Sequence, residues 1–420
     1  MRTASTSGTA RVSIDGLKSG ARLQSPIQDD KTSVLLVAAG VVLTEAMIEK
    51  IRKRGISFVR VSMSDLARVT KGDWEAPEQP KAVREPLRQT PREVAEKLKD
   101  QERKGKWNAG SKAFINTVKR PRSVENQKYR IPELSQKFAT TEVEIKGAFV
   151  KLSQGKSLDA AVLEKISEEA LKEMAEDIDL FLITGMSRDE GQYPFSHSLQ
   201  TARLATAMGA NLGLDADSLK ELAMGCLIHD VGMLKVNPDL LNTERPLDSI
   251  ERLDITKHPI FAFDLIKQMP NISVGARMVA YQMHERIDGS GYPRKRMWFQ
   301  IHPLALIAMV ADTFIAMTSP RPHRPPIHPY YALVELLESV KAKQFDPAAV
   351  KALITVVGLF PVGSFVELSD KRIGQVRSTN EEQVARPMIE AWSPQTPDQK
   401  EVIDLAQRED LTIVRPYIMM

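Results

Sequence analysis

Between about residues 135 and 350 the chain repeats one pattern, in which apolar residues recur at helical spacing and short breaks of Gly, Pro, Asp and Asn separate the segments. Apolar residues three or four positions apart share one face of a helix, and that face leaves water only by packing against another element. No convincing strand interrupts the run. The sequence therefore predicts an all-α helical bundle as the centre of the protein.

Different patterns flank this region on both sides. Residues 1–70 combine short strand-like segments, Gly turns and one helix signal, which predicts a small α/β module. Residues 71–135 are rich in Pro and charge and poor in large apolar side chains, as in a polar, basic linker. Residues 351–420 alternate apolar and polar side chains around turns, which predicts a short C-terminal β extension. We expect a multidomain chain in which residues 136–350 form the helical domain.

The composition is that of a globular protein with several domains. The chain has 420 residues, 42% of them hydrophobic and 27% charged, and its net charge of +4 is too small to indicate DNA binding. The single cysteine, Cys226, excludes an internal disulfide framework and fits a reducing cytoplasm. The N-terminus lacks the apolar core of a signal peptide, and no apolar run is long enough to span a membrane. We therefore expect a cytoplasmic protein without a membrane span.

One pair of polar residues stands out in the helical region. His229 and Asp230 are adjacent at the end of a strongly apolar segment, Ala-Met-Gly-Cys-Leu-Ile. Burying an imidazole beside a carboxylate is costly unless something neutralises the pair. In a purely structural interpretation, the Asp accepts a hydrogen bond from a buried His. In a functional interpretation, both residues bind a cation and the carboxylate bridges two metal ions.

Other histidines and one carboxylate of the helical region fit the functional interpretation. Taken singly, a histidine on a helix is more often a packing or surface residue than a ligand. Here each candidate lies on or beside a different predicted helix, so that all could converge inside a bundle; they are His197, His258, His284 and Asp312. Imidazole and carboxylate without thiolate favour Mn, Fe or Zn over a structural cysteine site. Two ions that share a carboxylate would activate a water for attack on a phosphoester.

Several segments in consistent order resemble the HD-GYP family. They read HSLQTARLA, LIHDVGML, KHPIFAFDLI, MHERIDGSGYP and VADTFIAMTSPRPHR, and they cover about residues 180–350. Members of this family are bacterial metal-dependent phosphodiesterases of the HD superfamily, and their known substrate is the second messenger cyclic di-GMP. The flanking regions resemble the N-terminal unit and the C-terminal β extension often found beside this domain. The resemblance implies an HD-type helical bundle that acts in signal transduction.

The resemblance also implies roles for individual residues. A first metal would be bound by His197, His229, Asp230 and Asp312. Asp230 would bridge to a second metal held by His258 and His284, and Asp230 with His229 would form the catalytic pair. The residues implied near the substrate are Arg321, Arg324, Tyr292 and Pro293. The signature turn would be shaped by Asp288, Gly289 and Gly291, because glycine permits a positive φ and a tight reversal.

The chain departs from the family pattern at several positions. Met283 stands where members usually carry a histidine ligand of the second metal, and a thioether is a poor replacement on Mn or Fe. Met233 replaces a lysine expected to contact phosphate, and His323 replaces a tyrosine. Tyr193 stands where members with a third metal carry Glu. We therefore expect a retained first site for Mn or Fe, a weakened second site and no third site.

Three hypotheses follow for the function. The protein is a working cyclic di-GMP phosphodiesterase, a degenerate HD-GYP domain that binds and signals with little or no turnover, or a hydrolase of a different phosphoester. The N-terminal module has no histidine and no acids at ligand spacing. We therefore expect it to dock a partner signalling protein. The signature turn could dock such a partner as well. The helix LEKISEEALKEMAEDIDLFL could support a homodimer.

Overall fold

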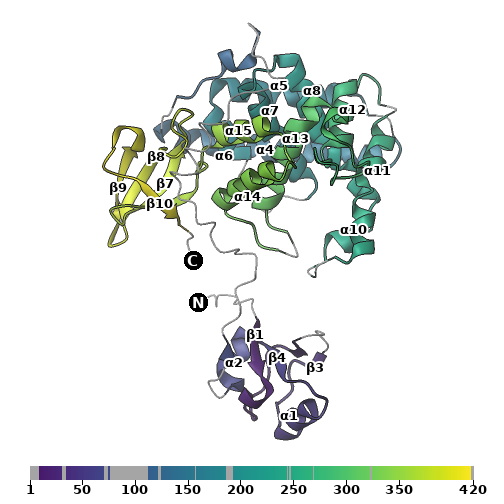
Figure 1. The fold of residues 1–420 in the computed structure, drawn as a ribbon, viewed down its shortest axis with the longest axis vertical. Helices are drawn as coiled ribbons and strands as arrows, with labels where there is room; N and C mark the ends of the chain where they lie inside the picture. The colour runs from purple at the N-terminus through teal and green to yellow at the C-terminus, as the bar shows by residue number, and fades with distance from the viewer. Residues whose placement is uncertain are drawn as a thin grey trace. The chain divides into compact units, whose positions relative to one another are not determined.

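The structure, a computed structural model, describes residues 9–30, 35–70, 74–75, 112–121, 124–156, 158–185, 193–243, 245, 247–267, 269–321 and 324–417. The chain divides into two compact units, residues 1–88 and residues 89–420 (Figure 1). Each unit has a hydrophobic core of its own. Within the described residues, every helix is too short or too polar to cross a lipid bilayer.

The N-terminal unit is the small α/β module that the sequence predicts. Among its described residues, five antiparallel strands form one sheet in the order β3-β2-β4-β1-β5, with β1 Thr9–Ser13, β2 Ile27–Asp29, β3 Leu35–Val37, β4 Phe58–Ser62 and β5 Trp74–Glu75. Two helices accompany the sheet, α1 Glu45–Arg52 and α2 Met63–Val69. The hydroxyl of Thr44 accepts the Met47 N–H and caps α1, as its place before a helical pattern predicts. The sequence did not reveal α2 or β5.

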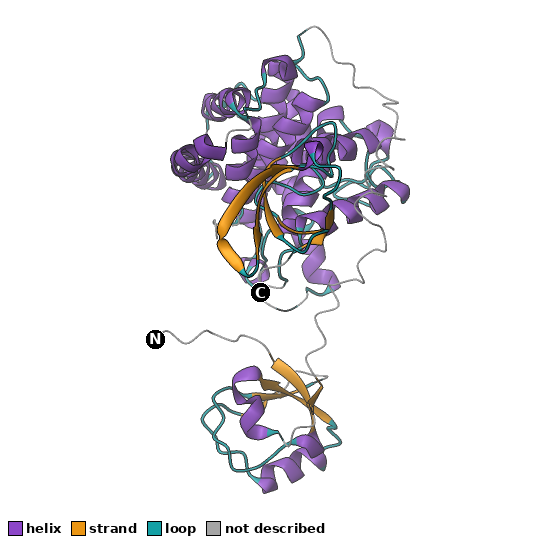
Figure 2. Ribbon diagram, turned by 90° about the vertical axis from the view of Figure 1, so that its left-hand side faces the viewer, coloured by secondary structure: helices purple, strands orange, loops and turns teal. Residues whose placement is uncertain are grey.

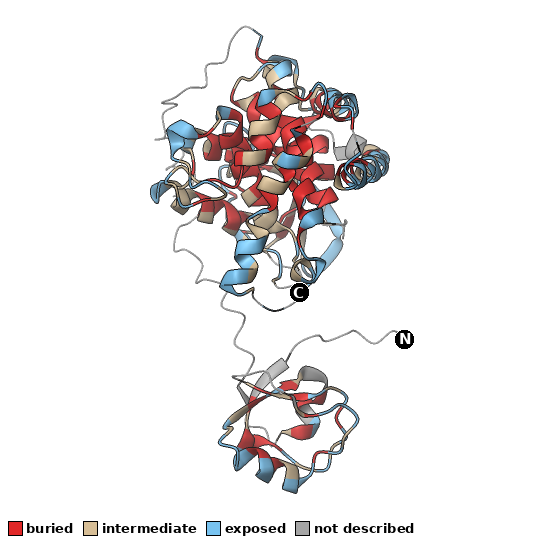
Figure 3. Cartoon of the chain, turned by 90° about the vertical axis from the view of Figure 1, so that its right-hand side faces the viewer, coloured by how far each residue is buried: buried red, intermediate tan, exposed pale blue. Residues whose placement is uncertain are grey.

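The larger unit contains the predicted helical bundle. Its helices within the described residues are α4 Val124–Ser153, α5 Ala161–Glu176, α6 Ile178–Gly185, α7 Phe195–Asn211, α8 Ala216–Ile228, α9 Pro238–Leu241, α10 Ser249–Ile255, α11 His258–Ile266, α12 Val274–Gln282, α13 Pro303–Thr318, α14 Pro329–Lys341 and α15 Pro347–Val357. Short 3-10 helices occur at η2 Phe114–Thr117, η3 His229–Lys235 and η4 Trp298–Gln300. Buried residues gather in the middle of this bundle (Figure 3). Helices α7 and α13 are buried over most of their length, so they form its centre.

Helical structure in this unit extends beyond the range that the sequence assigns to it. α4 begins at Val124, inside the range 71–135 interpreted as linker, and α15 continues past residue 350. The first turns of α4 carry mostly polar side chains and an internal proline, Pro132, so the local pattern resembled a linker. Phe114, which precedes α4, packs against the bundle core, and its N–H donates to Leu214 O. The division into four parts stays a prediction.

The predicted C-terminal β extension is a second antiparallel sheet (Figure 2). Its strands within the described residues run in the order β10-β6-β7-β8-β9, with β6 Phe365–Leu368, β7 Ile373–Ser378, β8 Met388–Ser393, β9 Thr396–Asp404 and β10 Ile413–Pro416. A buried polar junction joins this sheet to the bundle. The Asp179 carboxylate of α6 accepts hydrogen bonds from the hydroxyls of Ser378 and Thr379, at 2.5 and 3.1 Å. Arg120 Nε lies 3.3 Å from the same carboxylate, so three distant segments meet at one buried acid.

A glycine sets how closely η3 approaches α11. A Cβ atom on Gly232 would lie 2.0 Å from the carbonyl oxygen of His258 and 2.6 Å from the amide nitrogen of Ala262. Both obstacles are backbone atoms, which cannot rotate away. Gly232 therefore allows the segment that carries His229 and Asp230 to lie directly on the first turn of α11.

Replacing this glycine should destabilise the helical unit. We expect Gly232→Ala to lower the free energy of unfolding by about 2 kcal/mol or more, because the added methyl group overlaps backbone atoms. Gly147→Ala is the matched control. Gly147 lies in α4, and a Cβ atom added to it would meet nothing within 4 Å, so the change should be neutral or stabilise by about 0.5–1 kcal/mol. Thermal and urea unfolding of both variants measure the difference, and equal stability would contradict the close approach.

Candidate metal centre

The structure brings all six predicted metal ligands together inside the bundle. Each is at most 8% exposed. They come from different elements: His197 from the first turn of α7, His229 and Asp230 from the start of η3, His258 from the first residue of α11, His284 from the turn after α12, and Asp312 from the middle of α13. Convergence of residues as far as 115 positions apart in the sequence is what ligands of one centre require. It also explains why Asp312 can stand in an otherwise apolar helix.

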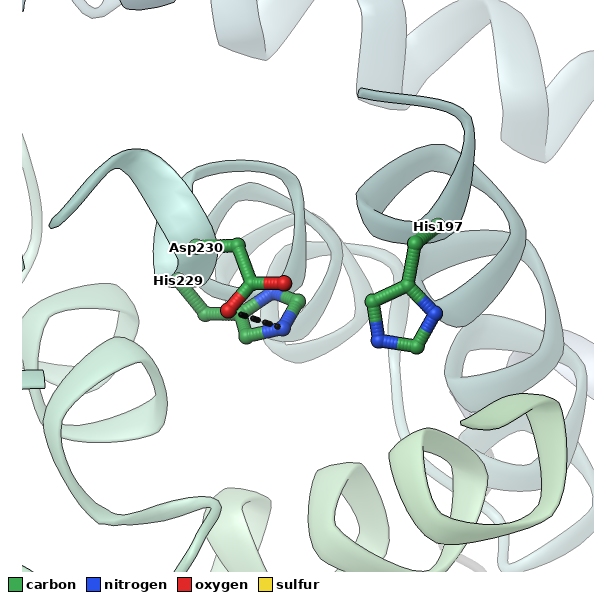
Figure 4. Close-up of side chains that lie close together, drawn as sticks. All are labelled: His197, His229 and Asp230. Carbon is green, nitrogen blue, oxygen red and sulfur yellow. Dashed lines mark ion pairs between the residues drawn. The ribbon is translucent and has the colours of Figure 1, made fainter. Parts of the chain in front are cut away.

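The first cluster consists of His197, His229 and Asp230 (Figure 4). One ligand atom from each of these residues lies within 4.8 Å of the other two. Asp312 belongs to the same place, because its Oδ1 lies 2.9 Å from His197 Nε2 and 3.7 Å from His229 Nε2. The set combines two imidazoles and two carboxylates, which are ligands that divalent transition metals accept.

The second cluster consists of Asp230, His258 and His284, again with ligand atoms within 4.8 Å of one another. His258 Nε2 lies 3.3 Å from Asp230 Oδ1 and 2.9 Å from His284 Nε2. Asp230 is therefore shared by both clusters. A carboxylate between two groups of donors can bind one ion through each oxygen, as in two-metal sites.

Backbone carbonyls fix the orientation of two imidazoles. His229 Nδ1 lies 2.8 Å from Cys226 O, and His258 Nδ1 lies 2.8 Å from Ile255 O. A carbonyl can only accept, so in each ring Nδ1 carries the proton and Nε2 keeps its lone pair. Both lone pairs face the clusters. Orientation of this kind by a backbone carbonyl is common for metal-binding histidines.

Two buried polar atoms of the first cluster fit a cation. Among the described residues, His229 Nε2 and Asp230 Oδ1 have no hydrogen-bond partner. Buried polar atoms without partners are rare in native proteins, and each needs an explanation. The unprotonated Nε2 of His229 cannot donate to the Asp230 carboxylate 3.3 Å away, whereas a divalent cation would satisfy both atoms. The residues present therefore fit a divalent metal.

Electrostatics keep these groups in the forms that bind metal. Burial alone would raise the pKa of Asp230, but the surrounding imidazoles, His229 foremost, outweigh it and lower that pKa to about 2. Burial lowers the pKa of His258 to about 3, and His284 adds to this effect. At neutral pH the carboxylate is charged and the imidazole neutral, so neither must lose a proton to bind an ion.

The signature turn holds His284 in place. The Glu285 carboxylate, wholly buried, accepts the N–H groups of Arg294 and Arg296 at 2.8 and 2.9 Å. Tyr292 donates its N–H to His284 O at 3.1 Å, and its ring stacks on the His284 imidazole with centroids 5.1 Å apart. Glu285 is not among the site residues predicted from the sequence. An acid directly after a ligand histidine was the signal that could have indicated its role.

Two glycines of the signature turn stand where a side chain would not fit or would be strained. Gly289 has a φ of +78°, and a Cβ atom on Gly291 would lie 2.3 Å from the amide nitrogen of Arg286. The exposed Asp288 accepts the N–H of Ser290 and closes the turn. Pro293 follows Tyr292 and is partly buried.

The two predicted substrate arginines differ in their surroundings. The Arg321 guanidinium lies 4.1 Å from the centre of the Tyr193 ring, and that ring lies 5.8 Å from the ring of His197. Arg324 instead donates to the carbonyls of Ala316 and Met317 at the end of α13. Arg321 thus lies beside the clusters, whereas in this structure the donors of Arg324 serve the helix end. The neighbouring position 323 lies outside the described residues.

The two methionines that depart from the family pattern are buried apolar residues. Met283 is fully buried and belongs to the main hydrophobic core, and Met233 is 5% exposed. Neither offers a nitrogen or oxygen ligand. The second cluster therefore has three donor residues, one of them shared.

Comparison with known proteins agrees with this geometry. Residues 167–349 match the family model described as HD domain. A cyclic di-GMP phosphodiesterase from Pseudomonas aeruginosa is 26% identical over 256 residues, which cover 60% of this chain and 61% of the relative. A cyclic di-GMP phosphodiesterase response regulator from Xanthomonas campestris pv. campestris is 28% identical over 254 residues, 60% of this chain and 63% of the relative. A 3'3'-cGAMP-specific phosphodiesterase from Vibrio cholerae is 33% identical over 135 residues, 32% of this chain and 31% of the relative. The chain spans less than two thirds of the length of each.

Removal of single ligands should separate the two clusters. We expect the wild type to bind two divalent ions per chain at saturation, His258→Ala to keep one, and Asp230→Ala to lose both, because Asp230 belongs to both clusters. His302→Asn is the control, since His302 caps α13 outside the clusters and Asn caps helices well. Metal analysis after dialysis gives the stoichiometry. Full occupancy in Asp230→Ala would show that the ions bind elsewhere.

The metal-free protein should lose stability in mild acid. His258 takes up a proton below its ordinary pKa of 6.5 when unfolded but only near pH 3 when folded, so falling pH favours the unfolded chain in this window. This residue contributes up to about 1.4 kcal/mol per pH unit. His258→Gln should make the slope of unfolding free energy against pH shallower between pH 6 and 4, measured by urea unfolding with chelator present. An unchanged slope would show that His258 titrates normally.

Proposed function

The chain belongs to the HD domain family through residues 167–349, and from this premise we propose that it is a metal-dependent phosphodiesterase that hydrolyses cyclic di-GMP. The observation that carries the proposal is the position of Asp230 between two buried clusters of metal donors. Two of the relatives are cyclic di-GMP phosphodiesterases, and a third is specific for another cyclic dinucleotide, which supports this substrate class.

The donor sets support Mn or Fe as the metal. Nitrogen and carboxylate ligands without thiolate suit these ions, and histidine, not cysteine, provides the neutral donors here. A first ion would be held by His197, His229, Asp230 and Asp312, and a second by Asp230, His258 and His284. The proposal has no third site, because Tyr193 offers a phenol at the position before α7 where a further carboxylate would be needed.

The chemistry that bound divalent cations supply at such a centre is activation of a water and neutralisation of charge on the phosphoester. The protein's own residues supply orientation. Cys226 O and Ile255 O hold the rings of His229 and His258, so the donor atoms need not reorganise on binding. Tyr292, stacked on His284, forms part of the wall beside the second cluster, and Pro293 follows it. Burial of all six ligands strengthens every interaction with the charged phosphate.

Catalysis is assigned to Asp230 and His229 within this arrangement. Asp230 would be a ligand of both cations, because its carboxylate belongs to both clusters. His229 is wholly buried and cannot take up a proton readily, because burial lowers its pKa, so it serves as a neutral ligand. These roles depend on the charge of the Asp230 carboxylate and on the lone pair of the His229 imidazole, both of which are present at neutral pH.

The remaining proposals concern partners and location. We propose that the protein acts in the cytoplasm and that the N-terminal unit or the signature turn docks a signalling partner. A homodimer through the helix LEKISEEALKEMAEDIDLFL has less support, because its apolar residues Leu163, Ile166 and Leu171 are already buried in the bundle. Size measurement of the purified protein distinguishes a monomer from a dimer.

The activity can be tested directly. We expect the Mn- or Fe-loaded protein to convert cyclic di-GMP to the linear dinucleotide or GMP, resolved by chromatography, with 3'3'-cGAMP as the competing substrate. Asp230→Ala should be inactive. A protein with its full metal content that cleaves neither dinucleotide would be a binding module. Cleavage of 3'3'-cGAMP alone would show that this dinucleotide, and not cyclic di-GMP, is the substrate.

The second cluster offers a gain-of-function test. Met283→His adds an imidazole to a cluster with three donor residues, so the second ion should bind about tenfold more tightly or better, with faster turnover at limiting metal. Met283→Leu conserves the volume of this buried side chain and should behave as the wild type. Calorimetric metal titration and turnover at a fixed Mn concentration provide the readout. Equal second-ion affinity in both variants would show that position 283 does not face the cluster.

A further inference from the structure

Tyr193 and Arg321 form a contact beside the metal centre that the proposed function does not use. The Arg321 guanidinium carbon lies 4.1 Å from the centre of the Tyr193 ring. The same ring lies 5.8 Å from the ring of His197, a member of the first cluster. A guanidinium on the face of a phenol ring is held by a cation–π interaction. The Tyr193 ring therefore lies close both to the charged Arg321 side chain and to His197, a predicted metal ligand.

The main chain at Arg321 is anchored to the helix that carries Asp312. The N–H and C=O of Arg321 pair with the C=O and N–H of Arg324, both at 3.1 Å. Arg324 in turn donates to the carbonyls of Ala316 and Met317 in the last turn of α13. Asp312 lies one turn earlier in the same helix. Arg321 and Asp312 are therefore held by one structural element.

The charge of Arg321 remains available for a ligand. Among the described residues, no carboxylate pairs with this guanidinium. The guanidinium carbon lies over the Tyr193 ring, and the five N–H donors are arranged along the edge of the guanidinium plane. Met233 of η3 is a buried thioether and carries no charge. Within the described part of the chain, Arg321 is thus a cation suited to a phosphate that approaches the first cluster.

The electrostatic surroundings of Tyr193 place it in the same site. Burial raises the pKa of its phenol, and the carboxylates of Asp230 and Asp312 add to this rise while Arg321 opposes it. A phenol is neutral at physiological pH even with its ordinary pKa of about 10. Its ring provides a surface without net charge on which the guanidinium can rest near two carboxylates.

We propose that Tyr193 is a positioning residue whose ring holds the Arg321 guanidinium beside the first cluster, where the guanidinium binds a non-bridging oxygen of the phosphoester. This inference rests on the proposed function only in that the substrate contains a phosphodiester. The ring, not the hydroxyl, is the essential part. An arginine without this contact would sample many rotamers. The Arg321 side chain held on the ring is already ordered when it binds the phosphate, so binding costs less conformational entropy.

A double-mutant cycle tests the coupling. The variants are Tyr193→Leu, Arg321→Gln and the double change, with Tyr193→Phe as the matched control that keeps the ring. The readouts are kcat and KM on bis(4-nitrophenyl) phosphate, a phosphodiester without guanine, and the dissociation constant of inorganic phosphate from the metal-loaded protein. Metal content and melting temperature are measured for each variant, and Tyr193→Met replaces Tyr193→Leu if the latter is unstable.

We expect Tyr193→Leu to weaken phosphate binding and raise KM about threefold to thirtyfold, the range of a cation–π contact, with unchanged metal content. Tyr193→Phe should match the wild type, and the double variant should be no worse than Arg321→Gln alone. Additive losses, equal damage in Tyr193→Phe and Tyr193→Leu, or no phosphate binding by the wild type would each overturn the proposal. Cleavage of bis(4-nitrophenyl) phosphate without cleavage of cyclic di-GMP would overturn the proposed substrate but leave the coupling measurable.

Discussion

The burial of two carboxylates in an apolar bundle is the constraint on which the rest of the structure depends. Asp230 and Asp312 are 1% and 6% exposed, and an ionised carboxylate at such depth is costly unless positive charge reaches it. The neighbouring imidazoles lower the pKa of Asp230, but burial lowers the pKa of His229 and His258, so at neutral pH these two rings are neutral and do not balance the carboxylate charge. The helical unit thus folds around a negative centre that a divalent cation completes. Metal binding and stability should therefore be coupled.

The centre can exist only because backbones approach closely at several glycines. Gly232 lets η3 lie on α11, and Gly225 lets α8 lie on α12, where a Cβ atom would meet Val279 at 2.5 Å. Gly291 lets the signature turn fold back onto the backbone of Glu285 and Arg286. Each contact brings a ligand-bearing element nearer to the others than side chains would permit. The glycines of this unit are therefore as much a part of the metal centre as its ligands.

Local patterns in the sequence predicted most of the helices and strands and singled out the buried histidines and acids, but they did not predict the contacts between distant residues. Helical spacing predicted the bundle, and the odd position of Asp312 in an apolar helix indicated a buried cation site. Arg324 binds the end of α13 through a carbonyl seven positions away, and Arg321 contacts Tyr193, which belongs to a separate element. No local periodicity in the sequence predicts such contacts. The start of α4 was missed for another reason: its first turns carry mostly polar residues in the sequence, without an apolar stripe.

The two clusters differ in the number of their donor residues. The first cluster has four donor residues, whereas the second has three and shares Asp230 with the first. A metal ion with fewer protein ligands keeps more positions open for water or substrate, which favours chemistry, but it also binds less tightly. The Asp230 side chain is already held in place by the first cluster. Binding of an ion at the second cluster therefore needs no further ordering of this side chain. With fewer donor residues, the second cluster should therefore differ from the first more in how tightly it binds an ion than in its geometry.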